Sequence, residues 1–183
     1  TISMVAVASA IPGSDSFTIG ATPAATAANL QAALTASIGK LAATSLTASS
    51  AVAASSDFFG NPPQRVAGPP FDIATAQVAG TSANTVIWYT GEDGPVPARA
   101  TATARIDTQL TVSYGMRANE PGIRTVMENV AALAAMTFSP GDPNAPDRAA
   151  ALGQRVAANL SISPGTQKIE DIVVELANGQ GLM

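Results

Sequence analysis

Oxygen-bearing side chains gather in the segment DPNAPDR, where they could bind a metal ion. Asp142, Asn144 and Asp147 lie close together there, and closely spaced oxygen ligands are typical of calcium loops. The glycine that makes the sharp turn of such a loop and its distal glutamate are missing, and prolines stiffen the segment. We therefore predict a turn followed by a helix N-terminus here, and no metal site.

A second acidic group could be imagined as a carboxylate site. Glu170, Asp171 and Glu175 follow helical spacing near the end of the sequence. They alternate with an apolar face of the same predicted helix. We therefore predict that these carboxylates form a solvated helix face.

Two arginines could bind an anion. Arg99 and Arg105 fall on one face of an alternating stretch over residues 98–107. Carboxylates lie nearby in sequence at Asp107, Glu92 and Asp93. We predict ion pairs with these carboxylates near the surface, which contribute little stability.

The aromatic pair Trp88–Tyr89 could anchor a ligand. It lies in the strand-like run TVIWYT, residues 85–90. Neighbouring residues of a strand point to opposite faces, so we expect one ring in the core and the other outside. Packing in the core or at an interface is the favoured interpretation, since a lone aromatic ring is not a site.

The composition argues against an enzyme. The chain has no Cys and no His, so thiolate chemistry and the commonest general base and metal ligand are missing. Serines and two lysines are present, but no local signature supports a Ser–Lys nucleophile. The sequence therefore predicts no catalytic residue, no cofactor site and no metal site.

Charge and hydropathy limit the partners. Charged residues make up 12% of the chain, with a net charge of −4, so no basic patch could neutralise nucleic acid. No apolar run reaches the length of a membrane span. The first ten residues resemble the apolar part of a signal peptide but lack its basic start, and we favour a strand there. Alanine supplies much of the 46% hydrophobic content, which predicts a lean core and a large interface with another surface.

The first part of the chain predicts strands and one long helix. We expect strands at residues 1–11 and 16–20, then a helix to Lys40 that Thr22 caps and Pro23 begins. Residues 41–50 read as a returning strand, residues 51–59 as a helix or a strand end, and residues 61–70 as a linker. Residues 85–90 and 98–107 read as antiparallel strands.

The stretch 111–138 is the strongest signal in the chain. A strand at 111–116 leads to an N-cap at Asn119 and then to a helix with Glu120 and Pro121 in its first turn. Two further helices follow, at about 144–160 and from about 165 onwards. The sequence therefore predicts an α+β fold, with small sheets and one long packed helix, followed by a layer of three helices. We place an outer, strand-rich domain at 1–118 and a helical segment at 119–183. We expect the packing to depend on apolar residues of these helices: Ile123, Val126, Met127, Val130, Leu133, Leu152, Val156, Ile169, Ile172 and Leu176.

Two stretches together resemble bacterial flagellins. SFTIGATPAATAANLQAAL followed by SLTAS is similar to the strand–helix–strand insert called the flagellin hook IN motif. ARIDTQLTVSYGMRANEPGIRTVMENVAALAAMTF, with QRVAANLS and GTQKIEDIVVELANGQ after it, resembles the latter half of alphaproteobacterial flagellins and flagellin-like hook-associated proteins. The likeness is more specific from Ala104 onwards than before it.

The resemblance implies an extracellular structural subunit of the bacterial flagellum, in the filament or at the hook–filament junction. Its partners would be other axial subunits, as a homopolymer of the full-length chain, with an export chaperone as a further candidate. The polymerising helices at the two ends of such subunits are missing, so we expect a piece of a longer protein. The main alternative is a surface adhesin or phage tail-fibre module, and a Ser–Lys or carboxylate enzyme is a weaker one.

Overall fold

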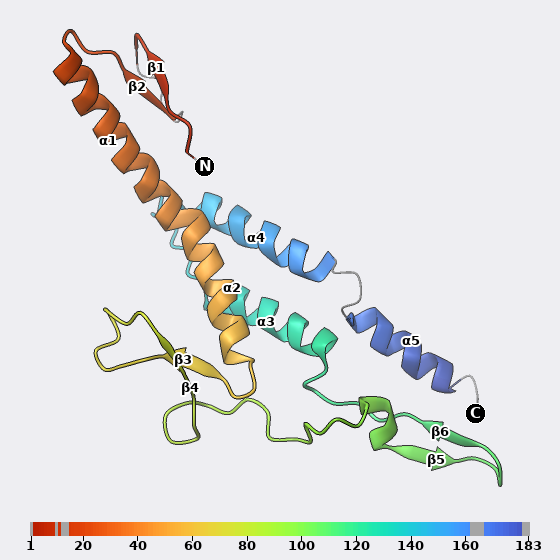
Figure 1. Ribbon diagram of the computed structural model, residues 1–183. Coiled ribbons are helices and arrows are strands. Elements are labelled where there is room, and N and C mark those ends of the chain that lie inside the picture. The colour runs from red at the N-terminus through yellow and green to blue at the C-terminus, as the bar shows by residue number, and fades with distance from the viewer. Residues whose placement is uncertain (1, 10, 12–14, 162–166, 181–183) are drawn as a thin grey trace. The chain divides into compact units, whose positions relative to one another are not determined.

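The computed structural model describes residues 2–9, 11, 15–161 and 167–180, and its fold is α+β (Figure 1). The predicted fold class, small sheets with a long helix and then further helices, is confirmed. Two compact units interleave along the sequence. Unit 1 comprises Thr1–Ser49 and Thr137–Leu152, and unit 2 comprises Ser50–Met136 and Gly153–Met183. The domain boundary predicted between residues 118 and 119 falls inside unit 2.

Unit 1 begins with two short strands and a long helix. Strand β1 (Val5–Val7) pairs in parallel with β2 (Ser16–Thr18), so the strand predicted over residues 1–11 is shorter than expected. Helix α1 (Pro23–Leu41) begins as predicted: the Thr22 hydroxyl accepts a hydrogen bond from the Ala25 N–H at 3.1 Å, and proline occupies the first turn. These features fix the helix start because they satisfy or remove donors that have no partner inside the helix.

The strand predicted over residues 41–50 is wrong, because this segment is helical. Ala42–Leu46 form a π-helix (η1), and α2 (Thr47–Phe58) continues from it. The hydroxyls of Thr44, Thr47 and Ser49 each donate to a carbonyl four or five residues earlier, at 2.7 Å. Hydroxyls that bond to a carbonyl one turn back are compatible with a helix, and alanine favours helix. The strand–helix–strand unit expected for this part of the chain therefore does not form.

Unit 2 contains a hairpin that the sequence did not predict. Strand β3 (Gln64–Val66) lies inside the expected linker and pairs antiparallel with β4 (Gln77–Ala79). The strand predicted at residues 85–90 is wrong, since these residues join no sheet. The Trp88 indole instead donates to the Gly60 carbonyl at 3.0 Å and packs edge-on to Phe59. Aromatic residues favour strands mainly through side-chain packing, and here they pack on the end of α2 instead.

Trp88 and Tyr89 contact each other rather than pointing to opposite faces. Their ring centroids lie 5.4 Å apart, and both side chains are half-buried. The alternation that we expected requires a strand, and this segment is not one. The predicted role of the rings in packing stands, because the pair extends a cluster that includes Phe58 and Phe59.

A second hairpin precedes the helices of unit 2. Residues Ala98–Thr101 form a 3₁₀ helix (η2), and β5 (Thr103–Arg105) pairs antiparallel with β6 (Thr111–Ser113). The strand predicted over 98–107 is therefore correct only for its second half, and its predicted pairing with residues 85–90 is wrong. Hydrogen bonds from Ala100 N–H and from the Thr101 hydroxyl, to Pro97 and Ala98 carbonyls, close the 3₁₀ turn.

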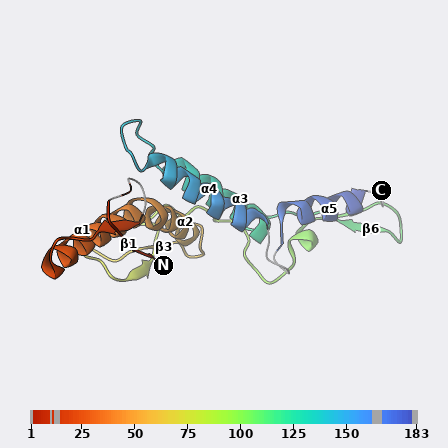
Figure 2. The ribbon, with the colours of Figure 1, turned by 90° about the horizontal axis from the view of Figure 1, so that it is seen from above.

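Helices α3 (Pro121–Ala135) and α5 (Ile169–Gln180) pack against each other, and α4 (Ala145–Ser161) continues from unit 1 into unit 2. In Figure 2, as in Figure 1, α5 runs beside the β5–β6 hairpin. A Cβ on Gly122 would lie 2.7 Å from the Lys168 carbonyl carbon, so a glycine at the start of α3 allows the close approach of the chain before α5. Within the described ranges, no helix combines the length and the apolar character that a membrane crossing requires.

The predicted packing residues divide into three groups. Leu152 and Ile172 are fully buried, in unit 1 and unit 2 respectively, and Val130, Leu133 and Ile169 are exposed. The others are half-buried: Ile123, Val126, Met127, Val156 and Leu176. The prediction was wrong for the three exposed residues. On α3, small and polar residues, Ala132 and Asn129, occupy the inner face instead of Val130 and Leu133.

Val130 offers a direct test of this arrangement. This residue is 59% exposed, so we expect Val130→Asp to change the free energy of unfolding by no more than about 0.5 kcal/mol. Ile172→Asp is the contrasting variant. Ile172 is buried, so a charge at that position would be buried without a partner and should strongly destabilise the fold. Urea unfolding followed by Trp88 fluorescence compares the two variants. A loss of folding on Val130→Asp would show that α3 packs through its other face.

Candidate functional site

A cleft of about 510 Å³ opens in unit 2 between the η2 turn, the start of α3 and α5. Three separate stretches of the chain form its walls: the loop that leads into η2, the residues between β6 and α3, and α5 with the residues before it. The lining residues are Asp93, Val96, Pro97, Ala98, Arg99, Arg117, Asn119, Glu120, Pro121, Gln167 and Glu175.

Arg99 and three polar partners form the centre of this site, and we refer to Arg99, Glu120, Gln167 and Glu175 as the Arg99 cluster. Local structure positions each one. Arg99 lies in the 3₁₀ turn that Pro97 begins, and Glu120 is the N-cap residue of α3, fixed by Pro121 after it. Gln167 lies just before α5, and Glu175 lies on that helix.

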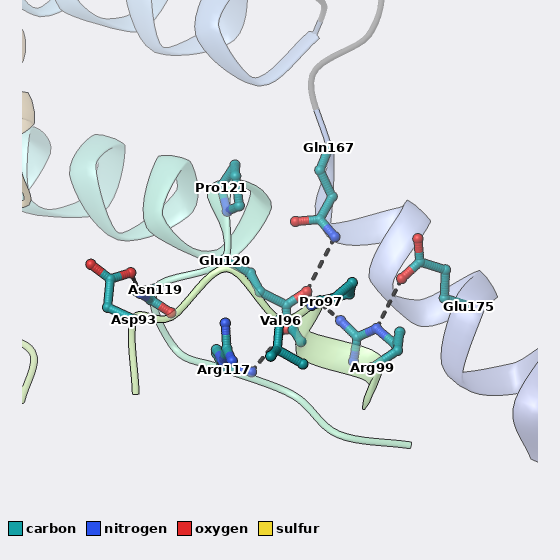
Figure 3. A pocket seen from close by; sticks show the side chains of 11 residues that line it. Asp93, Val96, Pro97, Arg99, Arg117, Asn119, Glu120, Pro121, Gln167 and Glu175 are labelled. Atoms are coloured by element: carbon teal, nitrogen blue, oxygen red, sulfur yellow. Dashed lines mark hydrogen bonds and ion pairs between the residues drawn. The ribbon is translucent and has the colours of Figure 1, made fainter. Parts of the chain in front are cut away.

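The Arg99 guanidinium joins these elements through all three of its nitrogens. Nε donates to Glu175 Oε2 at 2.9 Å, Nη2 pairs with Glu120 Oε2, and Nη1 donates to the Gly115 carbonyl. Gln167 Nε2 donates to the same Glu120 oxygen at 3.1 Å (Figure 3). The Glu120 side chain is only 6% exposed and that of Arg99 18%. The Arg99–Glu120 pair is therefore largely withdrawn from solvent, where charge-assisted hydrogen bonds are strong.

Arg117 forms a second set of contacts along the same wall. Its backbone N–H donates to Glu120 Oε1 at 2.9 Å, and its guanidinium contacts Glu92 Oε1 at 3.0 Å and the Gly94 carbonyl at 3.1 Å. The Asn119 amide donates to Asp93 at 2.6 Å. Glu120 thus accepts hydrogen bonds on both of its oxygens, and the loop at residues 92–94 is tied to the start of α3.

The contacts of the Arg99 cluster form a structural clamp. The carboxylates of Glu120, Glu175 and Asp93 each accept a hydrogen bond or an ion pair. Through Arg99, these contacts hold η2, α3 and α5 together.

No family model, curated protein or solved structure matches this chain. The role of the cluster has to be inferred from its own contacts.

The ion pairs predicted for Arg99 and Arg105 do not form as expected. Arg99 does not pair with Asp107, Glu92 or Asp93, because the 3₁₀ turn directs it to α3 and α5. Arg105 donates to the carbonyls of Asp107 and Thr108, its own neighbours in the hairpin.

The three carboxylates predicted to form a solvated face of α5 have different partners. Glu170 is exposed, and Asp171 accepts from the Lys168 N–H at 2.9 Å at the start of α5. Glu175, which is 48% exposed, forms an ion pair with Arg99. This ion pair was not predicted from the sequence, because the two residues lie 76 positions apart.

The residues considered for a calcium loop lie in unit 1, and the predicted turn and helix start are confirmed. Asp142 accepts from the Asn144 N–H at 2.9 Å and pairs with Arg148 at 2.7 Å, while Asp147 pairs with Lys40 at 2.9 Å. Across the described part of the chain, no group of three or more acidic, His or Cys residues could hold a metal ion. Arg148 also donates to the Ala43 carbonyl at 3.2 Å, so these charges tie the start of α4 to η1.

The titration of Asp142 provides a prediction. The Asn144 N–H, and then Arg148, hold the pKa of Asp142 below its ordinary value of 3.8. A lowered pKa in the folded state stabilises the fold above pH 3.8, and this contribution is lost as the pH falls through the folded pKa. Asp142→Asn should therefore be less stable than wild type at pH 6, with the difference shrinking towards pH 3. Urea unfolding followed by circular dichroism at several pH values measures it, with Glu170→Gln as the control. A difference that does not change with pH would contradict the assignment.

Proposed function

We propose that this chain is part of a structural subunit of the bacterial flagellum, either in the filament or at the hook–filament junction. Its role is architectural: the outward-facing domain and the start of the C-terminal helical part of an axial subunit. On this proposal the protein is extracellular and non-enzymatic. Its partners are other axial subunits, with an export chaperone during secretion.

The observation that carries an architectural role is the exposure of apolar helix faces. Only six apolar residues with side chains are buried in the described chain, and two of these are alanines: Ala48, Pro63, Val112, Ala132, Leu152 and Ile172. Large apolar residues on the helices remain exposed instead, among them Leu34 and Ile38 on α1, Val130 and Leu133 on α3, and Val173 on α5. Exposed apolar surface of this extent is typical of proteins that pack against other subunits.

The flagellar identity rests on the sequence resemblance, and the fold supports it unevenly. In the more specific part, from Ala104 onwards, the strand and helices occur close to where we expected them: β6, α3, α4 and α5. In the earlier part, the returning strand of the expected insert is replaced by η1 and α2. The proposal therefore depends on the second half of the chain.

Mass spectrometry of sheared appendages tests this proposal. Extracellular filaments are sheared from motile cells of the source organism, purified and digested with trypsin. Two tryptic peptides, residues 106–117 and 156–168, identify the protein. We expect both in the filament fraction, enriched over a fraction prepared from cells that lack flagella. Equal abundance in both fractions, or recovery in phage particles, would instead favour the adhesin or tail-fibre alternative.

A further inference from the structure

Two dipeptides of the sequence place an aspartate or an asparagine directly before a glycine: Asp93–Gly94 and Asn178–Gly179. In such a pair the glycine nitrogen can attack the Cγ atom of the preceding side chain, because glycine has no Cβ to obstruct the approach. The product is a five-membered cyclic imide, a succinimide, which water opens to isoaspartate. The backbone around each glycine decides whether its nitrogen can react.

The two glycines lie in different backbone environments. Gly179 lies in α5, where a backbone N–H donates to the carbonyl four residues earlier, so its nitrogen is held in the helix. Gly94 lies in an exposed loop. Its carbonyl accepts from Arg117 at 3.1 Å, but its N–H has no hydrogen-bond partner among the described residues. A Cβ on Gly94 would meet only Glu92 Oε1, at 3.6 Å, so the Gly94 nitrogen is both unbonded and sterically open.

Two amides hold the side chain of Asp93. Asn119 Nδ2 donates to Asp93 Oδ1 at 2.6 Å, and Asn61 Nδ2 donates to Asp93 Oδ2 (Figure 3). Each carboxylate oxygen therefore accepts a hydrogen bond, and such charge-assisted bonds are stronger than neutral ones. One of these oxygens leaves as water when the imide ring closes, so it must first give up the hydrogen bond that it accepts. The two amides therefore slow the ring closure.

We propose that Asp93–Gly94 is a site of spontaneous isoaspartate formation, and that Asn61 and Asn119 set its rate in the folded protein. The Gly94 nitrogen forms a bond to Asp93 Cγ, and the amide proton leaves with the carboxyl hydroxyl as one molecule of water. A second water then adds to one of the two ring carbonyls. Addition at the main-chain carbonyl breaks its bond to the Gly94 nitrogen and gives isoaspartate, whereas addition at the side-chain carbonyl restores aspartate.

The rearrangement changes one wall of the cleft. Isoaspartate adds one carbon to the main chain between residues 93 and 94 and moves the carboxylate, so the hydrogen bonds from Asn61 and Asn119 are lost. Glu92 and Gly94, which both contact the Arg117 guanidinium, lie on either side of the lengthened main chain. Isomerisation therefore releases the loop at residues 92–94 from the start of α3.

Incubation of the purified, folded chain at neutral pH tests the proposal. Samples are digested with trypsin, and the peptide of residues 66–99 is fragmented by electron-transfer dissociation, which distinguishes isoaspartate from aspartate of equal mass. We expect isoaspartate at position 93, formed at least about threefold faster in Asn119→Ala than in wild type, because one hydrogen bond to the carboxylate is lost. Gly94→Ala should slow the reaction at least about tenfold, because its Cβ shields the nitrogen while the contacts of Asp93 remain.

Ile172→Val controls for unfolding. Ile172 is buried in unit 2, so its truncation weakens the fold and leaves the two amides that hold Asp93 in place. Urea is added to the more stable variant until Asn119→Ala and Ile172→Val have equal unfolded fractions, and Asn119→Ala should still react faster.

Three outcomes would overturn the inference. Equal rates in these two matched variants would assign the acceleration to unfolding, and equal rates in Asn119→Ala and wild type would show that the amide does not set the rate. Isoaspartate at position 93 in the urea-unfolded chain, but in no folded variant, would show that the fold prevents the attack by Gly94. The inference does not rest on the flagellar proposal, because the reaction requires only the purified chain.

Discussion

Replacing Arg99 by methionine is expected to lower the free energy of unfolding of unit 2 by about 3–5 kcal/mol. Methionine keeps the aliphatic bulk of the side chain but removes the guanidinium. Glu120, which is 6% exposed, would then keep its charge in a buried site without the cation that pairs with it. A buried charge that loses its partner costs more than the pair itself contributes.

Urea unfolding followed by Trp88 fluorescence measures this effect, because Trp88 and the Arg99 cluster both belong to unit 2. Arg105→Met is the matched control. Arg105 lies in the adjoining hairpin, is exposed and donates to carbonyls of its own turn, so its replacement should cost no more than about 0.5 kcal/mol. Glu175→Gln should fall between the two, at about 0–1 kcal/mol, because Glu175 is half exposed. Equal stabilities for the Arg99 and Arg105 variants would contradict the clamp.

The second large effect is expected for Gly115→Ala, at about 3 kcal/mol of destabilisation. A Cβ at this position would lie 2.7 Å from the Ala102 nitrogen and collide with the Ala98 carbonyl and the Thr101 hydroxyl. Two of these atoms are backbone, so the η2 turn would have to move. The Gly115 carbonyl also accepts a hydrogen bond from Arg99, so the same shift would disturb the Arg99 cluster.

Gly153→Ala provides a control with the opposite sign. Gly153 lies inside α4, and a Cβ there meets nothing within 4 Å. We expect this variant to be stabilised by up to about 1 kcal/mol, because alanine favours helix over glycine. The same unfolding experiment, with circular dichroism added, compares the two. A tolerated Gly115→Ala would mean that η2 does not pack closely on the residues after β6.

Helices α1, α3 and α4 were predictable because their signals are local, whereas η1 and the start of α2 were predicted as a strand. Thr22 and Pro23 mark the start of α1, and residues before and after α4 mark its ends. The observed ends of both helices lie within a residue or two of the predicted ones. The N-cap of α3 was predicted at Asn119, one residue too early. The rule that favours asparagine at an N-cap failed here, because Glu120 takes that position without a side-chain cap hydrogen bond and the Asn119 amide donates to Asp93 instead.

The strands and the site depended on contacts between distant residues. Every strand of the described chain is three residues long. Alternation over a longer stretch therefore overestimated β1, β2, β5 and β6 and predicted a strand at residues 85–90 that is absent, while β3 and β4 were not predicted. The Arg99 cluster unites residues that lie 21 and 76 positions apart. The sequence offered only one signal for it: an acidic residue directly before Pro121 at the start of the strongest helix. Nothing local identified its cationic partner.

Immunogold microscopy tests the proposed function most directly. Antibodies raised against this chain are applied to intact motile cells, and gold particles are counted along each flagellum and over the cell body. The flagellar proposal predicts label on the organelle: continuous label along its length for a filament subunit, or a single cluster at the hook junction for a junction protein. Label over the cell body with bare flagella would contradict the proposal.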